Sequence, residues 1–545
     1  MVRGFDRDTH APEEAQAVLL RRILQRNSAT EYGQRYNFAG IKSAVEFTRR
    51  VSVVTFADLA TDVERMKSGE QGVLTRSAPV FYNVTSGTTD KPKFIPVTLE
   101  GQSLLGGLVR QWFCRTFRDH PTMLNGAALC VAGAAEEGQT SAGVPYGSAS
   151  GIMSRLLPPA LRRGFVLPPE VAAISDYDLR YYVMARLALG RDVSFAVTPN
   201  PMTLVKIAEA GVAHQDAIIA SIRSGVLMAE PLFEICPADS RLIEDIEAGL
   251  QPAPVRAAFL ENVMVQHGRL LPSACWPNLA VVGCWLGGSI GYHADRLCPF
   301  YGEKVPLRDL GYLASEGPMS IPDQDRLPAG ILALRNQYYE FVPEDEEPQS
   351  CSQPLCAHQV EVGRRYRVLL TNVNGLYRYD INDIVEIHSF YNRTPVVAFV
   401  RKAGDVLNVM GEKVHVNQLM QTLCVLRDEL GIGISQFRAV PDMAGARHAF
   451  LVCLDESVPE ERLRAEMIPL LDRTLAEVNV EYASKRKSGR LNPPCLYLMD
   501  ARWLQWGGGM ACGGGRQDAQ AKWRSIAFEM TPEERKLITR TVGVI

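Results

Sequence analysis

The sequence lacks three features that would each indicate a class of protein. Its 12 cysteines include no CxxC pair, so the spacing of a zinc site is absent. It has no excess of charge, since 58 Lys and Arg residues balance 61 Asp and Glu residues, which excludes a generally basic nucleic-acid binder. It also has no long hydrophobic run. The most apolar stretch, residues 279–290, is shorter than the roughly 20 residues that span a bilayer.

The start of the chain differs from a targeting signal. Residues 1–15, MVRGFDRDTHAPEEA, are charged where a secretory signal peptide would be apolar. Sparse cysteines in a chain of 545 residues are typical of a reduced, intracellular protein. We therefore predict a cytoplasmic protein that binds neither membranes nor nucleic acid.

Helical and strand patterns alternate along the first 400 residues. Residues 12–27 have the apolar spacing of an amphipathic helix, with Pro12 in its first turn. Residues 201–211 predict a helix that ends at Gly211. Short apolar runs predict strands, and their alternation with helices indicates an α/β layered domain. The predicted strands include residues 280–286, 366–371, 383–388 and 395–400.

The pattern changes near residue 400. Leucines on one face predict a helix at 415–430. Further on, the sequence predicts strands near 435–440, 447–454 and 495–499, and a helical stretch near 459–482 that is interrupted at Pro469. We therefore predict two domains, residues 1–398 and 399–545, of which the second is a small α+β domain.

The strongest local motif is TSGTTDKPK, residues 85–93, which follows an apolar run. Hydroxyls and backbone N–H groups donate to phosphate oxygens, a glycine lets the backbone approach, and lysine neutralises charge. The motif is not the P-loop pattern GxxxxGK[ST], and a polar hairpin turn would have the same composition. The phosphate-binding candidates are Thr85, Ser86, Gly87, Thr88, Thr89 and Lys93.

Four weaker motifs carry further candidates. Glu316, in YLASEG, offers the oxygen ligands that Mg²⁺ prefers, although a solvated helix cap would look the same. Asp383 lies where a strand begins and could accept both hydroxyls of a ribose, or belong to a turn. Arg401 and Lys413 lie at and just after the predicted boundary. Lys522 follows six glycines in residues 507–515, so it could swing into a site or belong to a surface loop.

In this order the motifs resemble those of the adenylate-forming enzymes, the superfamily of firefly luciferase, acyl-CoA synthetases and amino-acid adenylation domains. Within it the chain resembles the Gretchen Hagen family of acyl acid amido synthetases, often labelled auxin-responsive promoter proteins, and looks like a bacterial-type member. The closer match rests on TEYG (30–33), TSGTTDKPKFIP (85–96), GGSIGYHADRL (287–297), YLASEG (312–317), YYEFVP (338–343), GLYRYDINDIV (375–385) and FVRKAGDVLNVMGEK (399–413).

The resemblance implies a fold and a reaction. The fold is a large N-terminal adenylate-forming domain, with α/β layers and a β-barrel-like part, and a small C-terminal α+β lid. The reaction uses ATP and Mg²⁺. A carboxylate attacks the α-phosphate to give an acyl-adenylate and pyrophosphate, and an amine, usually of an amino acid, then attacks the acyl carbon and releases AMP.

The resemblance also implies roles for the candidate residues. Asp383 would bind the ribose, and Glu316 would lie toward Mg²⁺. Lys413 and Lys522 match lid lysines that reach the nucleotide, and with Glu316 they are the candidate catalytic residues. The residues expected to contact ATP are Thr85, Ser86, Gly87, Thr88, Thr89, Lys93, Ala314, Ser315, Glu316, Tyr379, Asp383 and Arg401.

Departures from the family pattern leave two alternatives open. Asp90 and Asn382 each stand where many relatives have glycine, and the tail AQAKWRS, which contains Lys522, differs from the NQYKTPR of plant relatives. One alternative is therefore a non-catalytic relative that binds nucleotide. The other is an AMP-forming acyl-CoA or carrier-protein ligase, because it shares the adenylation step. The sequence does not identify the acid, the amine, the acyl pocket or the oligomeric state.

Overall fold

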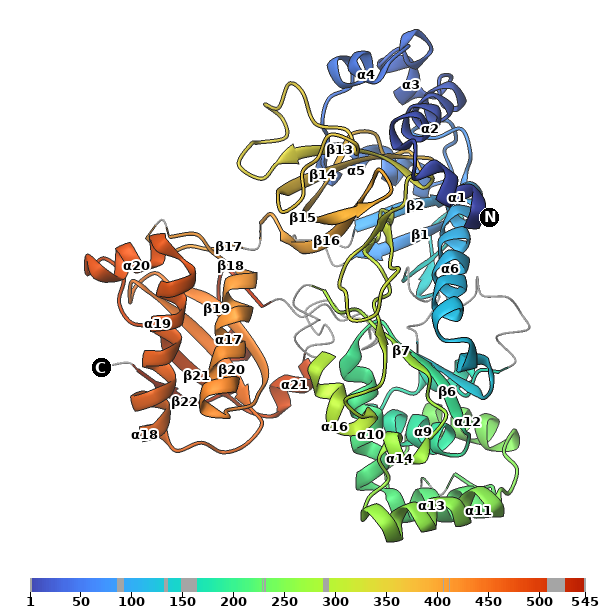
Figure 1. The fold of residues 1–545 in the computed structure, drawn as a ribbon, viewed down its shortest axis with the longest axis vertical. Helices are drawn as coiled ribbons and strands as arrows, with labels where there is room; N and C mark the ends of the chain where they lie inside the picture. Colours follow the sequence, from blue (N-terminus) through green and yellow to red (C-terminus); the bar gives the residue numbers. More distant parts are fainter. Residues whose placement is uncertain are drawn as a thin grey trace. The chain divides into compact units, whose positions relative to one another are not determined.

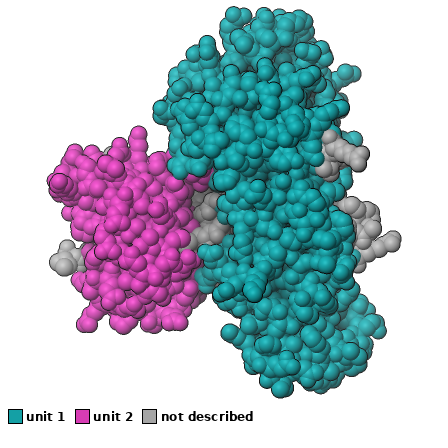
Figure 2. Space-filling model, viewed as in Figure 1, with its two compact units in different colours: residues 1–399 teal, residues 400–545 magenta. Residues whose placement is uncertain are grey.

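Residues 1–399 and 400–545 form separate units in the computed structural model of the chain (Figure 2). The boundary between the units lies next to the one predicted between residues 398 and 399. The structure describes residues 2–85, 93–131, 136–148, 164–227, 229, 232–287, 294–404, 406–410, 412–506 and 525–543.

A parallel sheet with the strand order β3-β6-β7-β8 lies in the first unit (Figure 1). Its strands are Ala127–Cys130 (β3), Val193–Val197 (β6), Val281–Gly283 (β7) and Leu307–Arg308 (β8). These strands share one hydrophobic core with the helices around them, which explains their near-continuous apolar runs. The helices are α9 (Tyr177–Leu189), α10 (Pro201–Ala213), α11 (Gln215–Ser224), α12 (Pro237–Ala248) and α13 (Pro254–His267).

The predicted end of helix α10 at Gly211 is wrong by two residues. The helix continues to Ala213, and Gly211 lies inside it. A side-chain Cβ on Gly211 would lie 3.2 Å from Cδ1 of Leu189, on the neighbouring helix α9. The glycine therefore allows close helix packing rather than ending the helix.

Antiparallel pairs dominate a second, six-stranded sheet with the order β11-β12-β16-β15-β14-β13 (Figure 1). Its strands are Ser320–Ile321 (β11), Gly330–Leu332 (β12), Gln337–Pro343 (β13), Arg365–Asn372 (β14), Tyr379–Tyr391 (β15) and Thr394–Lys402 (β16). Apolar residues of this sheet share a core with the N-terminal helices. Those helices include Pro12–Arg26 (α2), as predicted, and Glu31–Arg35 (α3), Ala44–Arg50 (α4) and Phe56–Lys67 (α5).

A buried ion pair joins the N-terminal segment to this sheet. Nε of Arg378 lies 3.1 and 3.0 Å from the two carboxylate oxygens of Glu340, and both residues are buried. Nη1 of Arg378 donates to the carbonyls of Thr48 and Val51, each at 2.8 Å. Next to this pair, Val54 forms a parallel β-bridge with Tyr379. The start of β15 is thus held by residues more than 300 positions earlier in the chain.

The second unit contains a four-stranded sheet with the order β19-β20-β21-β22. Its strands are Ile434–Asp442 (β19), Arg447–Leu454 (β20), Cys495–Met499 (β21) and Ile538–Val542 (β22). The predicted helix at 415–430 is confirmed as Val416–Leu430 (α17). Contrary to the prediction, Pro469 does not interrupt the helical stretch. It lies in the first turn of α19 (Ile468–Val478), after a π-helical turn at Leu463–Met467 that follows α18 (Glu460–Arg462).

No helix in the described part of the chain is both long enough and apolar enough to cross a membrane.

Candidate functional site

The predicted phosphate motif connects two paired strands. Strand β1 (Pro79–Thr85) runs antiparallel to β2 (Lys93–Thr98), and Thr85 is paired with Lys93. The predicted residues Ser86, Gly87, Thr88 and Thr89 lie outside the described residues, as does Asp90. The structure therefore places the two ends of the motif side by side at the end of one hairpin.

Two buried asparagines hold the Ser315–Glu316 turn. Ala314, in β9 (Leu313–Ala314), pairs with Gly317, in β10 (Gly317–Pro318), which leaves Ser315 and Glu316 as the turn between two short strands. Nδ2 of Asn83, on β1, donates to the Ser315 carbonyl at 2.7 Å. Nδ2 of Asn372, on β14, donates to the Glu316 carbonyl at 3.0 Å. These contacts bring three of the predicted motifs to one place.

A tyrosine hydroxyl links this turn to the predicted ribose carboxylate. The hydroxyl of Tyr312, just before β9, donates to Oδ2 of Asp383 on β15. Burial and the negative charge of Asp383 raise the pKa of Tyr312 well above its usual value, so the hydroxyl keeps its proton. Burial and the neighbouring Glu316 likewise raise the pKa of Tyr379 well above its usual value. Tyr379, Asp383 and Glu316 are thus close neighbours, as the resemblance implies.

Asp383 lies within a strand rather than at the start of one, which corrects the sequence prediction. Strand β15 already begins at Tyr379. Its register against β14 shifts there: Arg367 is opposite Ile384, whereas Leu369 is opposite Asp380. One residue of β14 therefore faces three residues of β15, 381–383. Such bulges redirect side chains and occur often beside functional sites.

Asn382 adopts a left-handed backbone conformation inside this bulge. Its φ angle is 60°, in a region that glycine adopts freely and that asparagine tolerates better than most residues. Its backbone N–H donates to Oδ1 of Asp380 at 2.8 Å. The asparagine found where relatives have glycine is therefore compatible with the backbone geometry. This departure from the family pattern is not an argument against catalysis.

The left-handed backbone conformation at Asn382 predicts that a glycine and a valine variant differ in their free energy of unfolding. Asn382→Gly should change the free energy of unfolding by less than about 0.5 kcal/mol, because glycine adopts the same φ angle without strain. Asn382→Val should cost about 1–3 kcal/mol, because a β-branched residue is strongly disfavoured there. Urea unfolding of both variants measures the difference. Equal stabilities would mean that residue 382 does not adopt this conformation in solution.

Asp309 supports the site from the end of the parallel sheet. It follows β8 and its side chain accepts the backbone N–H groups of Leu286 at 2.7 Å and Gly311 at 2.6 Å. Burial raises its pKa to about 6 despite these two donors. The carboxylate joins the segments that follow β7 and β8, and so helps to fix the chain that leads into Tyr312.

Two predicted residues of the second unit, Arg401 and Lys413, lie near its first hairpin. Arg401 is buried, and its Nη1 donates to the carbonyls of Lys402 at 3.1 Å and Ala403 at 3.4 Å. Lys413 is exposed and has a φ angle of 31°. It precedes β18 (Val414–His415), which pairs with β17 (Val406–Leu407). Lys522 lies outside the described residues.

Glu412 anchors the hairpin that carries Lys413. Its fully buried carboxylate accepts the backbone N–H groups of Val409 and Met410, each at 2.7 Å, and lies 2.8 Å from Nε2 of His448. Burial would raise the pKa of Glu412, but His448 and the two backbone donors outweigh it and lower the pKa to about 2. The exposed Lys413 thus belongs to a loop whose backbone is held in place by the buried Glu412 carboxylate.

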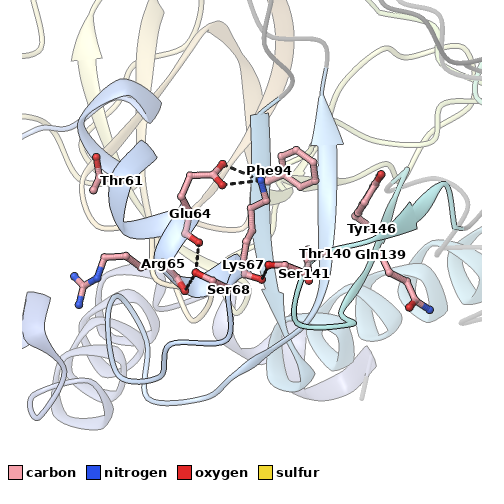
Figure 3. A pocket seen from close by; sticks show the side chains of 10 residues that line it. All are labelled: Thr61, Glu64, Arg65, Lys67, Ser68, Phe94, Gln139, Thr140, Ser141 and Tyr146. Atoms are coloured by element: carbon pink, nitrogen blue, oxygen red, sulfur yellow. Dashed lines mark hydrogen bonds and ion pairs between the residues drawn. The ribbon is translucent and has the colours of Figure 1, made fainter.

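A pocket of about 610 Å³ lies near the β1–β2 hairpin of the first unit (Figure 3). Nζ of Lys67 lies 3.9 Å from the ring centre of Phe94, one of its walls. Successive side chains of a strand point to opposite faces, so Phe94 points away from the face of Lys93. None of the predicted site residues that the structure describes lines this pocket, whose walls are Thr61, Glu64, Arg65, Lys67, Ser68, Phe94, Gln139, Thr140, Ser141 and Tyr146.

Comparison with known families accounts for most of the chain. Residues 1–307 match the GH3 family N-terminal domain, and residues 330–402 match the GH3 family central domain. The chain belongs to the GH3 family. As a GH3 protein it is an acyl acid–amino acid ligase, so the predictions of family and enzyme class are confirmed.

Similar proteins match about three quarters of this GH3 protein. A probable indole-3-acetic acid-amido synthetase of Oryza sativa subsp. japonica is 28% identical over 454 residues, which cover 75% of this chain and 72% of the relative. A jasmonoyl–L-amino acid synthetase of Nicotiana attenuata is 26% identical over 433 residues, with coverage of 76% and 73%. Both relatives are named as synthetases that act on a carboxylic acid, and the name of the second also states an amino acid.

Solved structures confirm the predicted fold class of this GH3 protein. The GH3.15 acyl acid amido synthetase matches with a TM-score of 0.83 at 17% identity, over 99% of this chain and 96% of that one. A 2-hydroxyisobutyryl-CoA ligase, solved in its postadenylation state, matches with a TM-score of 0.54 at 12% identity, over 94% and 88%. The mixed α/β fold with a large first and a smaller second domain is therefore that of GH3 enzymes, related to adenylate-forming ligases.

Sequence reasoning missed Asn83, Asn372, Tyr312 and Asp309 in this GH3 site. The first two lie in strands and show no local pattern, because their partners are main-chain carbonyls far along the chain. Tyr312 could have been found, since it opens the YLASEG motif that the sequence already singled out.

Proposed function

We propose that this protein adenylates a small carboxylic acid with ATP and transfers the acyl group to the amine of an amino acid. The observation that carries the proposal is the meeting of the β1–β2 hairpin, the Ser315–Glu316 turn and the Asp383 bulge through the hydrogen bonds of Asn83 and Tyr312. A nucleotide with phosphates at the hairpin and ribose at Asp383 is the ligand that suits this set.

Each predicted residue has a role in this proposal. Asp383 binds the ribose, and the β9–β10 turn lines the adenine and α-phosphate site through Ala314 and Ser315, beside Tyr379. Phosphate contacts come from the ends of the hairpin and the residues between them: Thr85, Ser86, Gly87, Thr88, Thr89 and Lys93. The unit 400–545 acts as the lid, with Arg401 near its start and with Lys413 and Lys522 as the lysines that reach the nucleotide.

Glu316 suits a magnesium ion that is bound together with the nucleotide. Within the described ranges, no group of three His, Cys, Asp or Glu side chains could hold a metal by itself. Mg²⁺ at nucleotide sites is usually held by one or two carboxylates together with phosphates and waters, so a single glutamate is sufficient. The ion would neutralise phosphate charge, and Glu316 would orient it.

The chemistry explains why the site binds ATP at all. A carboxylate is a poor acyl donor because its oxygen leaves badly as an oxide. AMP leaves readily, so an acyl-adenylate reacts with an amine. The residues of the site mainly position the reactants and balance the charge on the phosphates.

Product analysis tests the proposal. With an accepted acid, ATP should give AMP and pyrophosphate, because the α-phosphate is attacked. A panel of carboxylic acids, each with amino acids, with coenzyme A and with neither, identifies the acid and the acceptor. Thioester formation with coenzyme A in place of an amide would favour the acyl-CoA ligase, and ADP with phosphate as products would contradict the proposal.

A further inference from the structure

A buried ion pair lies beside the bulge that carries Asp383. Nε and Nη2 of Arg367, on β14, donate to Oδ1 and Oδ2 of Asp380, on β15, at 3.0 and 2.6 Å. The Asp380 side chain is 1% exposed and that of Arg367 is 19% exposed. Two parallel hydrogen bonds from a guanidinium to a carboxylate fix their relative orientation as well as balancing charge.

The pair spans the shift in register. Arg367 is opposite Ile384, directly after the bulge, whereas Asp380 lies directly before it. The guanidinium therefore connects the two ends of the bulge. Oδ1 of Asp380 also accepts the backbone N–H of Asn382, in the middle of the bulge. The middle residue of the bulge is thus bonded to the same carboxylate that pairs with Arg367.

We propose that Arg367 and Asp380 are positioning residues for nucleotide binding, because they hold the bulge in the conformation that directs Asp383 toward the ribose. The inference rests on the proposed function, in which Asp383 binds that ribose. Neither Arg367 nor Asp380 contacts the nucleotide in this arrangement. Both act through Asp383.

The pair also controls charge near the nucleotide. Burial, and after it the negative charges of Glu316, Asp380 and Asp383, raise the pKa of the Tyr379 phenol, so all three carboxylates act on one hydroxyl. Removal of Arg367 would leave Asp380 buried without its guanidinium, and repulsion would then act on Asp383 and on the phosphates. The loss of Arg367 should therefore impair nucleotide binding more than the loss of the Asp380 charge.

The test compares ATP with 2′,3′-dideoxy-ATP, which lacks both ribose hydroxyls. Pyrophosphate release with a saturating acid gives kcat/KM for each nucleotide. If no acid supports turnover, calorimetric dissociation constants give the same ratio. The wild type should prefer ATP by about 100-fold or more, the effect of two charge-assisted hydrogen bonds. In Arg367→Ala and Asp380→Asn the preference should fall toward one, further in Arg367→Ala.

Arg365→Ala is the matched control. Nε of Arg365 donates to Glu386 at 3.0 Å between the same two strands but outside the bulge, so this variant should keep the wild-type preference. Arg367→Lys keeps the charge without the two-pronged geometry and should show an intermediate preference. It also replaces Arg367→Ala if melting curves show that the alanine variant does not fold.

The outcomes distinguish a failure of this inference from a failure of the proposed function. If the variants lose activity equally with both nucleotides and keep the preference, the ion pair only supports the fold and the inference is wrong. If the wild type itself does not distinguish the nucleotides, then Asp383 does not bind the ribose, and the failure lies in the proposed function.

Discussion

Asp383→Ala should weaken ATP binding by about 100-fold or more, because two ribose hydroxyls would each lose a charge-assisted hydrogen bond worth about 1.5–3 kcal/mol. Asp383 is 2% exposed, so its carboxylate is largely shielded from water and a hydrogen bond there is not weakened by solvent. Calorimetric titration with ATP measures the loss.

Two further variants make this result specific. Asp383→Asn keeps an acceptor for the Tyr312 hydroxyl but removes the charge, so it should fold normally and still bind ATP poorly. Glu386→Gln, on the same strand but outside the bulge, should bind ATP like the wild type. Unchanged ATP affinity in both Asp383 variants would mean that residues 375–385 were aligned wrongly with the family motif.

The largest effect on stability is expected from Arg378→Ala, which should lower the free energy of unfolding by about 3–5 kcal/mol, because removing one partner leaves a buried charge uncompensated. The remaining carboxylate is Glu340, which is 2% exposed. The carbonyls of Thr48 and Val51 also lose their donor. Urea unfolding at pH 7 measures the effect.

The pH dependence of this variant gives an independent check. Burial already raises the pKa of Glu340, and Arg378 opposes that rise, so the pKa rises further without the arginine. A carboxyl whose folded pKa exceeds its unfolded value stabilises the folded state as the pH falls. Part of the loss should therefore be recovered between pH 7 and pH 5, and Glu340→Gln should restore part of it at pH 7.

An exposed ion pair provides the comparison for Arg378. The side chains of Arg473 and Glu429 are 62% and 54% exposed, so Arg473→Ala should cost less than about 1 kcal/mol. Similar losses in Arg473→Ala and Arg378→Ala would mean that the buried pair contributes no more than a surface one.

Local patterns in the sequence predicted the regular elements and the motifs. The helix α17 follows from the apolar stripe that it buries, and the strand β21 follows from its short, continuous apolar run. Glu316 and Asp383 were found because short motifs contain them. Their proximity depends on Tyr312, whose partner lies 71 positions away, and no periodic pattern reports such a contact.

Two of the wrong predictions failed because of contacts distant in the chain, and one failed for a local reason. Glycine often ends a helix, but Gly211 lies inside one, where the neighbouring helix leaves little room for a side chain. Pro469 lacks a backbone N–H, but the first turn of a helix does not need one, so the helical stretch continues. The bulge at residues 381–383 depends on the register between two strands, which neither strand determines alone.

The bridge between Val54 and Tyr379 has a consequence for the order of folding. Strand β15 joins the N-terminal segment only after nearly all of the first unit has left the ribosome. Contacts between such distant residues slow folding, because a long loop must close before they form. Until then Glu340 and the carbonyls of Thr48 and Val51 lack Arg378, so nascent chains truncated before residue 378 should be degraded by proteases faster than chains that extend beyond residue 399.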